Sequence, residues 1–285
     1  MGPLIGTTDG VYDLTGGSVL NGQQVRHLRR FEDTWWAVDD TGNVWHESDG
    51  AASAPPGVSF TCLQPVPDRV WLGADAARLY VLEDGQIVED ERFADAPGRD
   101  AWHTPWGGPP DIRSIALGSD GVLYVNVLVG GILRYDATGP TPTLDIDSDV
   151  HQVAAHPRRA LVVAATARGL AVAVDGRHFE FRSEGLEHLY CRAVAVHDES
   201  VLVSASRGPR GTAAQLYRGS LDGGVLESCR SGLPDEFTGN IDTHCLLATG
   251  EGWFVGNGST VWSSEDGGTT WGIAIEDLAP ITCLA

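Results

Sequence analysis

Polar side chains recur in pairs at the start of short apolar segments, and their types could do acid–base or anion-binding chemistry. Four pairs follow one another along the chain, each with one residue between its members: Asp111/Arg113, Asp149/His151, Tyr190/Arg192 and Asp242/His244. Carboxylates and imidazoles transfer protons, whereas guanidinium groups bind carboxylate, sulfate or phosphate through paired hydrogen bonds. Because alternate residues of a strand share a face, we expect both members of each pair to point the same way.

These pairs belong to a pattern that repeats along the whole chain. Seven segments combine leading polar positions with alternating apolar residues, and we expect them to be inner strands of similar units: residues 25–28, 60–63, 112–115, 150–153, 191–194, 243–246 and 281–284. A turn, usually containing Asp-Gly, follows six of them: residues 48–50, 83–85, 137–139, 174–176, 221–223 and 265–267. Short strands in units of about 40 residues are typical of β-propellers.

The repeat predicts an all-β fold, a seven-bladed β-propeller of four-stranded antiparallel blades that forms one domain over residues 1–285. Six blades are the alternative. Residues 281–284 are expected to pair with strands from the N-terminus. That pairing closes the ring and removes the sheet edges that an open array would expose.

One of the turns carries a more specific motif. Residues 264–271 match the pattern S-x-D-x-G-x-T-W, whose fixed positions are Ser264, Asp266, Gly268, Thr270 and Trp271. The chain therefore resembles the Asp-box (BNR-repeat) β-propellers, which include sialidases, sortilin-type receptors and photosystem assembly factors. The phrases WHTPWGGPPD and GNIDTHCL resemble uncharacterised bacterial and archaeal members. The resemblance implies a structural role for the hairpin and a binding face formed by the loops that lead into the inner strands.

The composition restricts the classes of partner. The chain has 39 acidic and 19 basic residues, every basic residue is an arginine, and the net charge is −20. This charge argues against nucleic acid and anionic membranes as partners, and it resembles the acidic proteins of salt-accumulating halophiles. The N-terminal segment lacks the pattern of a secretion signal, and the five cysteines have no metal-binding spacing. We expect a cytoplasmic, monomeric protein.

The polar pairs predict a pocket at the channel mouth that binds a small anionic or sugar-like ligand. Arginines would hold the anion and aromatic rings would cover its apolar face. Loop residues 86–110 and 224–241 supply further groups on the same face. The predicted ligand-binding residues are Arg26, Arg113, Arg192, Trp102, His103, Trp106, Asp111, Asp149 and Glu236.

Enzymatic chemistry in this pocket is left open. A hydrolase or lyase would use Asp242, His244, Tyr190 and His151 as catalytic groups. By resemblance to sialidases, the three arginines, Tyr190, Asp242 and Glu236 could take the roles of arginine triad, nucleophile and acid. However, the chain lacks an N-terminal F/Y-R-I-P motif and has only one complete Asp-box.

Two alternatives use the same face differently. His103, His151 and His244 could converge on a divalent metal, with Asp149 or Asp242 beside them, which would make the protein a metal-dependent enzyme. Alternatively, the face could be a non-enzymatic interaction scaffold or a lectin-like module, with Trp102, Trp106 and Phe237 as anchors. Nucleotide-binding and nucleophile-elbow motifs are absent from the sequence.

Overall fold

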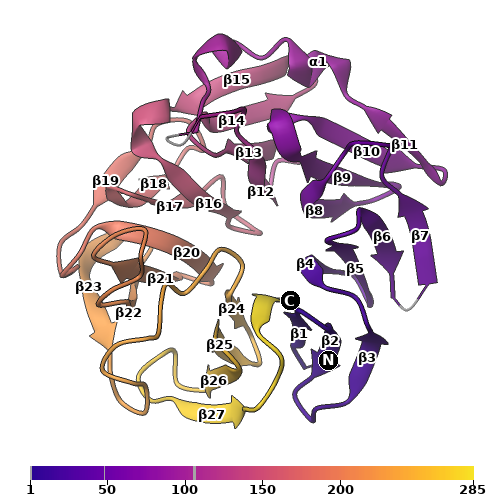
Figure 1. The fold of residues 1–285 in the computed structure, drawn as a ribbon. Coiled ribbons are helices and arrows are strands. Elements are labelled where there is room, and N and C mark those ends of the chain that lie inside the picture. The colour runs from indigo at the N-terminus through magenta and orange to yellow at the C-terminus, as the bar shows by residue number, and fades with distance from the viewer. Residues whose placement is uncertain (1, 48, 105–106) are drawn as a thin grey trace.

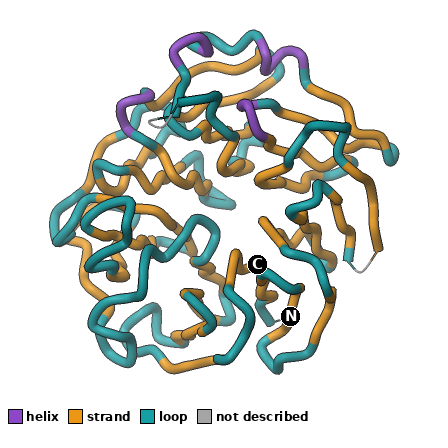
Figure 2. The backbone as a smooth tube through the Cα atoms, viewed as in Figure 1, coloured by secondary structure: helices purple, strands orange, loops and turns teal. Residues whose placement is uncertain are grey.

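The strands of the protein are arranged in a ring of small sheets around a central channel, as a computed structural model shows (Figure 1). The structure describes residues 2–47, 49–104 and 107–285. Across these residues the strands form seven four-stranded antiparallel sheets, each a blade of the propeller. Helix is confined to short pieces near the rim and between blades, and strands and loops make up the rest (Figure 2). The predicted seven-bladed fold is confirmed.

The blades follow one another along the chain, and in six of them the inner strand comes first. These six blades are β4 (Val25–Phe31), β5 (Thr34–Asp39), β6 (Asn43–His46), β7 (Asp49–Ser53); β8 (Phe60–Val66), β9 (Arg69–Ala74), β10 (Leu79–Glu83), β11 (Gln86–Glu89); β12 (Ile112–Leu117), β13 (Leu123–Val127), β14 (Gly131–Asp136), β15 (Gly139–Leu144); β16 (Val150–Ala155), β17 (Val162–Thr166), β18 (Gly169–Ala173), β19 (Glu180–Arg182); β20 (Tyr190–His197), β21 (Ser200–Ser206), β22 (Gln215–Ser220), β23 (Gly223–Cys229); and β24 (Leu246–Thr249), β25 (Gly252–Asn257), β26 (Thr260–Ser264), β27 (Gly272–Ile275). The α-helix α1 spans Glu91–Ala94, and 3-10 turns span Asp75–Ala77, Arg99–Ala101 and Ile146–Ser148.

The seventh blade combines both ends of the chain. Its strand order is β28 (Ile281–Leu284), β1 (Leu4–Thr7), β2 (Gly10–Asp13) and β3 (Ser18–Asn21). The backbone N–H of Leu4 donates to the carbonyl of Ala285 at 2.6 Å, and the N–H of Ala285 donates to Leu4 at 3.0 Å. The two ends therefore lie side by side (Figure 1), and the predicted closure of the ring is confirmed.

The hydrophobic core lies between neighbouring blades. The middle strands β17 and β18, with the sequences VVAAT and GLAVA, are buried at every position because another blade covers each face. One cluster joins Val163 and Val172 of one blade to Val194, Val203 and Tyr217 of the next. Small and β-branched side chains let two pleated sheets approach closely, so each blade is stable only within the ring.

Residues 264–271 form the hairpin between β26 and β27. The Asp266 carboxylate accepts hydrogen bonds from the N–H groups of Thr269 and Thr270, at 3.0 and 2.8 Å, and from the Thr270 and Ser264 hydroxyls. Gly268 has a φ of +82°, which favours glycine, and its carbonyl accepts from the buried Trp271 indole at 3.1 Å. These hydrogen bonds lower the pKa of Asp266, so it stays a carboxylate that satisfies the turn.

One expected inner strand is wrong in its bounds. Residues 243–246 were expected to be extended, but β24 begins at Leu246 and the preceding residues form a turn. His244 has a φ of +69°, and the N–H of Cys245 closes the turn by donating to the Asp242 carbonyl at 3.0 Å. Asp242 and His244 are therefore not alternate residues of a strand, and their relative orientation comes from the turn.

The cysteines lie in the core, and the helical segments are short. All five cysteines are free and buried, as expected for small core side chains. Burial raises the pKa of Cys62, Cys191 and Cys283 to about 12, so these thiols stay protonated. In the described part of the chain, no helix has the length and hydrophobicity needed to span a bilayer.

Candidate functional site

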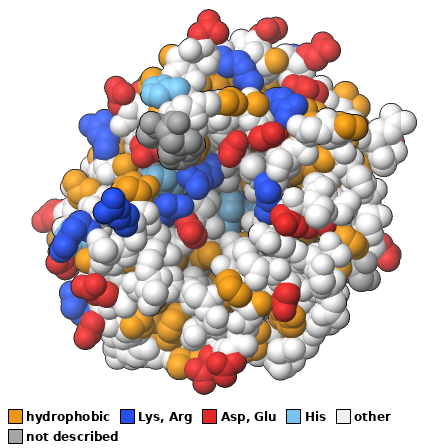
Figure 3. Space-filling view, in the orientation of Figure 1, with side chains coloured by type: hydrophobic (Ala, Val, Ile, Leu, Met, Phe, Trp, Pro, Cys, Tyr) orange, Lys and Arg blue, Asp and Glu red, His pale blue; other side chains and the backbone are white. Residues whose placement is uncertain are grey.

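A polar pocket opens at the centre of one face of the ring. We call it the upper pocket; it has a volume of about 380 Å³ and is lined by Arg26, Thr61, Asp111, Arg113, Arg192, Asp242, Thr243, His244, Ile281 and Thr282. Figure 3 shows this face hollowed at its centre, with basic, acidic and histidine side chains gathered around the hollow. The pocket contains six of the residues predicted to bind or transform a ligand: Arg26, Asp111, Arg113, Arg192, Asp242 and His244.

Irregular strand pairing positions the side chains of the pocket. In the pairing of β4 with β5, Val25 lies opposite Asp39 and His27 opposite Val38, so Arg26 is an extra residue without a partner. The same interruption of the strand pairing occurs in other blades. The residues without a regular pairing partner there are Thr61, Arg113, His151, Thr282 and the pair Arg192–Ala193. Such β-bulges change the direction of a side chain, and here most of the bulged residues line the upper pocket.

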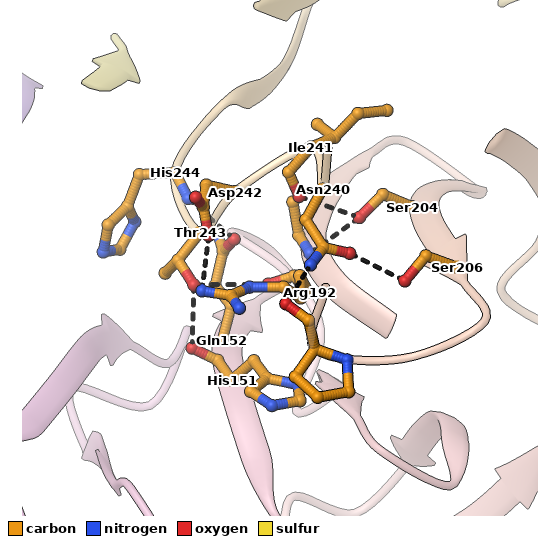
Figure 4. A network of polar contacts seen from close by, with 12 residues as sticks. His151, Gln152, Arg192, Ser204, Ser206, Asn240, Ile241, Asp242, Thr243 and His244 are labelled. Carbon is orange, nitrogen blue, oxygen red and sulfur yellow. Dashed lines mark hydrogen bonds and ion pairs between the residues drawn. The ribbon is translucent and has the colours of Figure 1, made fainter. Parts of the chain in front are cut away.

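Arg192 and Asp242 form an ion pair at the rim of the pocket. Their side chains approach to 2.5 Å, with the Arg192 side chain 15% exposed and the Asp242 side chain 59% exposed. Figure 4 shows the pair beside Thr243, whose hydroxyl donates to the carbonyls of His151 and Arg192. Among the described residues, the Arg192 Nε has no hydrogen-bond partner, so the guanidinium keeps donor capacity beyond the ion pair.

Of the three arginines that line the upper pocket, Arg113 is the one whose guanidinium has no hydrogen-bond or ion-pair partner among the described residues. Within the described parts of the chain, no group accepts a hydrogen bond from its guanidinium or forms an ion pair with it, although the side chain is largely buried and lines the pocket. Burial and the nearby positive charge of Arg192 lower its pKa, which still leaves it charged. A desolvated cation next to a second cation is a site where an anion would be strongly favoured.

The two other charged groups of the pocket differ in their environment. Arg26 donates to the Ser59 hydroxyl at 2.7 Å and to the Phe60 carbonyl at 3.3 Å, so it is anchored to the next blade. Burial, with Asp75 as a second negative charge nearby, raises the pKa of Asp111. Asp111 is therefore the carboxyl group of the upper pocket whose environment favours the protonated form.

His151 and Tyr190 lie beside the pocket rather than in its lining. The His151 Nδ1–H donates to the Cys191 carbonyl at 2.6 Å, its Nε2 lies 3.7 Å from an Asp149 carboxyl oxygen, and its ring packs on Tyr190 with centroids 4.5 Å apart. Burial lowers the pKa of His151 to about 3 and raises the pKa of Asp149. His151 is therefore neutral near pH 7, which removes it as a general acid there.

His244 lines the upper pocket and packs against the buried His27. Their ring centroids are 3.8 Å apart, and the His244 Nε2–H donates to the Arg113 carbonyl at 3.2 Å. Burial lowers the pKa of His244 to about 3, and burial and the adjacent His244 lower the pKa of His27. The pair of tilted rings is therefore neutral. His27 was not among the predicted site residues, because no carboxylate stands next to it in the sequence.

The loop residues that were predicted to cover the ligand and that the structure describes do not line the upper pocket. Trp102 packs on Phe93 in the core between two blades, and His103 is exposed with its Nδ1–H donating to the Ala101 carbonyl at 2.9 Å. Glu236 is exposed, whereas Phe237 is buried against Trp262. Trp106 lies outside the described residues. The repeat pattern of the sequence could not show whether a loop residue packs in the core or contacts a ligand, because a tryptophan in a loop is suited to both roles.

The predicted metal ligands have separate partners. His103 bonds to its own loop, His151 to Cys191 and His244 to Arg113. In the described segments, no group of three or more histidine, cysteine or acidic side chains is arranged to hold a metal ion. The structure thus does not bring the three histidines together as a metal centre.

Comparisons with known proteins identify the fold. No protein-family model matches the chain, and no curated protein matches its sequence significantly. Among solved structures, a streptogramin B lyase is 14% identical with a TM-score of 0.62, covering 89% of this chain and 82% of the lyase. The WD40 propeller domain of Doa1 is 11% identical with a TM-score of 0.63, covering 95% of this chain and 86% of that domain.

A third similar structure is the extracellular domain of a hybrid two-component system from B. thetaiotaomicron. It is 15% identical with a TM-score of 0.64, and the match covers 94% of this chain but only 37% of that domain. The neighbours thus include a lyase, a WD40 propeller domain and an extracellular domain of a two-component system. Together with the seven closed blades, these comparisons define the class of the chain as the β-propellers, whose fold carries many unrelated functions.

Proposed function

We propose that the protein binds a small anionic ligand in the upper pocket. The observation that supports this most directly is the Arg113 guanidinium, which is largely buried and has no acidic or carbonyl partner among the described residues. Arg192 lies close enough to lower the pKa of Arg113, so these two of the three pocket arginines form adjacent positive charges. A carboxylate, sulfate or phosphate between them would satisfy both donors.

The rest of the lining favours an anion that also carries hydroxyl groups. Thr61, Thr243 and Thr282 line the pocket, and Asp111 and Asp242 can accept hydrogen bonds at its edge. A sugar acid combines a carboxylate for the arginines with hydroxyls for these groups. The pocket volume of about 380 Å³ is sufficient for a single ring of this kind.

Titration calorimetry with sulfate, phosphate and glucuronate tests this function. Arg113→Ala removes a charge-assisted contact worth about 1.5–3 kcal/mol, so we expect affinity for the preferred anion to fall at least about tenfold without unfolding of the ring. Arg192→Ala should have an effect of the same sign. Arg69→Ala is a matched control, because Arg69 is an exposed arginine paired with Glu83. Equal binding by wild type and Arg113→Ala would contradict the proposal.

Acid–base chemistry in the same pocket is a second candidate function, as in a hydrolase or lyase. It is favoured by Asp111, which lines the pocket and whose pKa is raised by burial. Asp111→Asn should then abolish turnover of a nitrophenyl glucuronide but leave glucuronate affinity within about twofold. Absence of turnover by the wild type would leave the protein a binding module.

The chain is further proposed to be a divergent Asp-box propeller. Supporting this are the hydrogen bonds of Asp266 and the buried Trp271 in the hairpin between the third and fourth strands of its blade. The other hairpins have lost most of the motif. The net charge of −20 supports a halophilic, cytoplasmic origin as part of the same proposal.

A further inference from the structure

A second cavity lies at the opposite end of the central channel. We call it the lower cavity; it has a volume of about 370 Å³. The inner strands connect the two sites: on β4, Arg26 lines the upper pocket, and Arg29, three residues later, lines the lower cavity. Between the sites, the Gln152 side chain lines the lower cavity and accepts the backbone N–H of His244, which lines the upper pocket, at 3.0 Å.

Arg29 is the charged residue of the lower cavity, and its charge is not compensated. Its Nη2 donates to the Ile115 carbonyl at 3.3 Å, and its Nε is buried with no hydrogen-bond partner among the described residues. In the same described part of the chain, no carboxylate forms an ion pair with Arg29. Burial lowers the pKa of Arg29, although its side chain keeps partial contact with solvent. A guanidinium has five N–H donors, and here one is used.

Most of the side chains that line the lower cavity are apolar, although polar atoms contribute the larger part of its surface. Besides Arg29, the polar side chains among the described lining residues are Gln64 and Gln152; every other one belongs to Gly, Ala, Val, Leu or Pro. Gln152 is already bonded to the backbone of Val194 and His244. In a chain with 39 acidic residues, this lining contains none. A lone guanidinium in such a wall raises the free energy of the protein unless an anion pairs with it.

We propose that the lower cavity is a second, separate anion site, which takes a small monocarboxylate with a short apolar tail. The carboxylate would pair with the free donors of Arg29, and the tail would lie against side chains such as Leu117, Ala154 and Leu247. One positive charge balances one negative charge. A dianion such as phosphate or sulfate would exceed the one positive charge that lines the cavity, which disfavours it.

Butyrate is the probe for this site, and the backbone amides of Leu117, Ala154 and Leu247 report binding there in ¹H–¹⁵N NMR spectra. We expect saturable shifts of these amides in the wild type. Arg29→Met should weaken butyrate binding at least about tenfold, because it removes the charge but keeps an unbranched apolar side chain. Arg29→Met is also expected to unfold at the same or a higher temperature, because an unpaired buried charge is lost.

Matched variants separate the lower cavity from other effects. Arg158→Met removes an arginine beside the cavity-lining Pro157, but Arg158 is exposed and paired with Asp198, so butyrate binding should not change. Arg113→Ala should also leave it unchanged, even where it abolishes glucuronate binding in the upper pocket. Failure of one proposal is thus distinguishable from failure of the other.

Three results would overturn the proposal. The first is the absence of saturable shifts at the three amides in the wild type. The second is equal butyrate affinity in the wild type and Arg29→Met. The third is an equal response to sodium chloride at matched ionic strength, which would make the cavity a site for inorganic anions. Should Arg29→Met fail to fold, Ala154→Leu tests the same site: it narrows the cavity, keeps Arg29 and should weaken butyrate binding.

Discussion

At the scale of single residues, the three arginines of the upper pocket differ in what already holds them. Arg26 is bonded to Ser59 and the Phe60 carbonyl, and Arg192 is paired with Asp242. Arg113 has no such partner in the described parts of the protein. The capacity of the pocket for an anion therefore depends on Arg113 first and on how firmly Asp242 holds Arg192.

Asp242→Asn should increase the affinity of the upper pocket for an anion. The Arg192–Asp242 pair is half open to solvent, and such pairs contribute about 0.2–1 kcal/mol, so releasing Arg192 should tighten binding up to about fivefold. Calorimetric titration of glucuronate into wild type and variant measures this. Weaker binding by Asp242→Asn would indicate that Asp242 contacts the ligand directly.

His151 should make the fold sensitive to acid. Its folded pKa of about 3 lies below the ordinary value of 6.5, so the unfolded chain binds a proton that the folded chain does not. Its contribution to stability is complete above pH 6.5 and is lost as the pH falls towards 3, by up to about 1.4 kcal/mol per pH unit.

The variant His151→Gln removes this proton linkage. Between pH 6.5 and pH 5 it should lose up to about 2 kcal/mol less stability than the wild type, as measured by urea unfolding at the two pH values. His103→Gln is a suitable control, because His103 is an exposed side chain whose ring bonds to the Ala101 carbonyl of its own loop. Parallel losses in wild type and His151→Gln would show that the buried imidazole is not the acid-sensitive group.

At the scale of elements, turns and bulges decide where the chemistry lies. Regular alternation predicted the co-facial pairs, yet Arg26, Arg113 and Arg192 point into the upper pocket at bulges, and His244 reaches it from a turn. The hairpin at residues 264–271 has a different role. Its polar side chains bond to the backbone of the turn, and Trp271 packs in the core between blades.

Trp271→Ala should destabilise the ring strongly. The indole is 6% exposed and its Nε1–H is bonded to the Gly268 carbonyl, so its loss leaves a cavity and an unpaired carbonyl. We expect a decrease of about 3–5 kcal/mol in the free energy of unfolding, measured in urea. Ile273→Ala in β27, the strand that follows Trp271, is the control, since Ile273 is 58% exposed and should change stability little. Similar effects of the two changes would show that the indole is not part of the core.

At the scale of the whole molecule, stability depends on closure of the ring. β28 supplies the inner strand of the blade that β1 to β3 complete, and all four residues of β1 are buried. The channel also separates two sites with different linings: an upper pocket with several charged residues and a lower cavity whose one charged residue is Arg29. Both exist only because seven inner strands converge on one axis.

Removal of residues 281–285 should open the ring. β1 would become an unpaired edge, and Cys283, Leu284 and Ala285 would leave holes in the core, so we expect aggregation or loss of cooperative unfolding. Size-exclusion chromatography and thermal unfolding measure both. A circular permutant that joins the native ends and opens at Asp84–Gly85, a turn between β10 and β11, keeps every strand and should stay folded. A stable, monomeric truncated chain would contradict the role of closure.

The fold was accessible from the sequence because each blade repeats the same local pattern. Alternating apolar residues, turns near Asp-Gly and the split last copy together determine the strands, their order and the closure of the ring. The arginines at residues 26, 113 and 192 were also predictable as a set, because they occupy equivalent positions of the repeat.

Tertiary structure alone decided which polar residues share a pocket and in what charge state. Local pattern carries no information about burial, so it could not show that His151 and His244 are neutral, that Trp102 packs in the core, or that Arg29 is left without a counter-charge. Asp242 and His244, which alternate in the sequence, lie on a turn whose direction is set by contacts with Gln152 and β28. Repetition makes the ring predictable, whereas desolvation and pairing across blades depend on residues far apart in the chain.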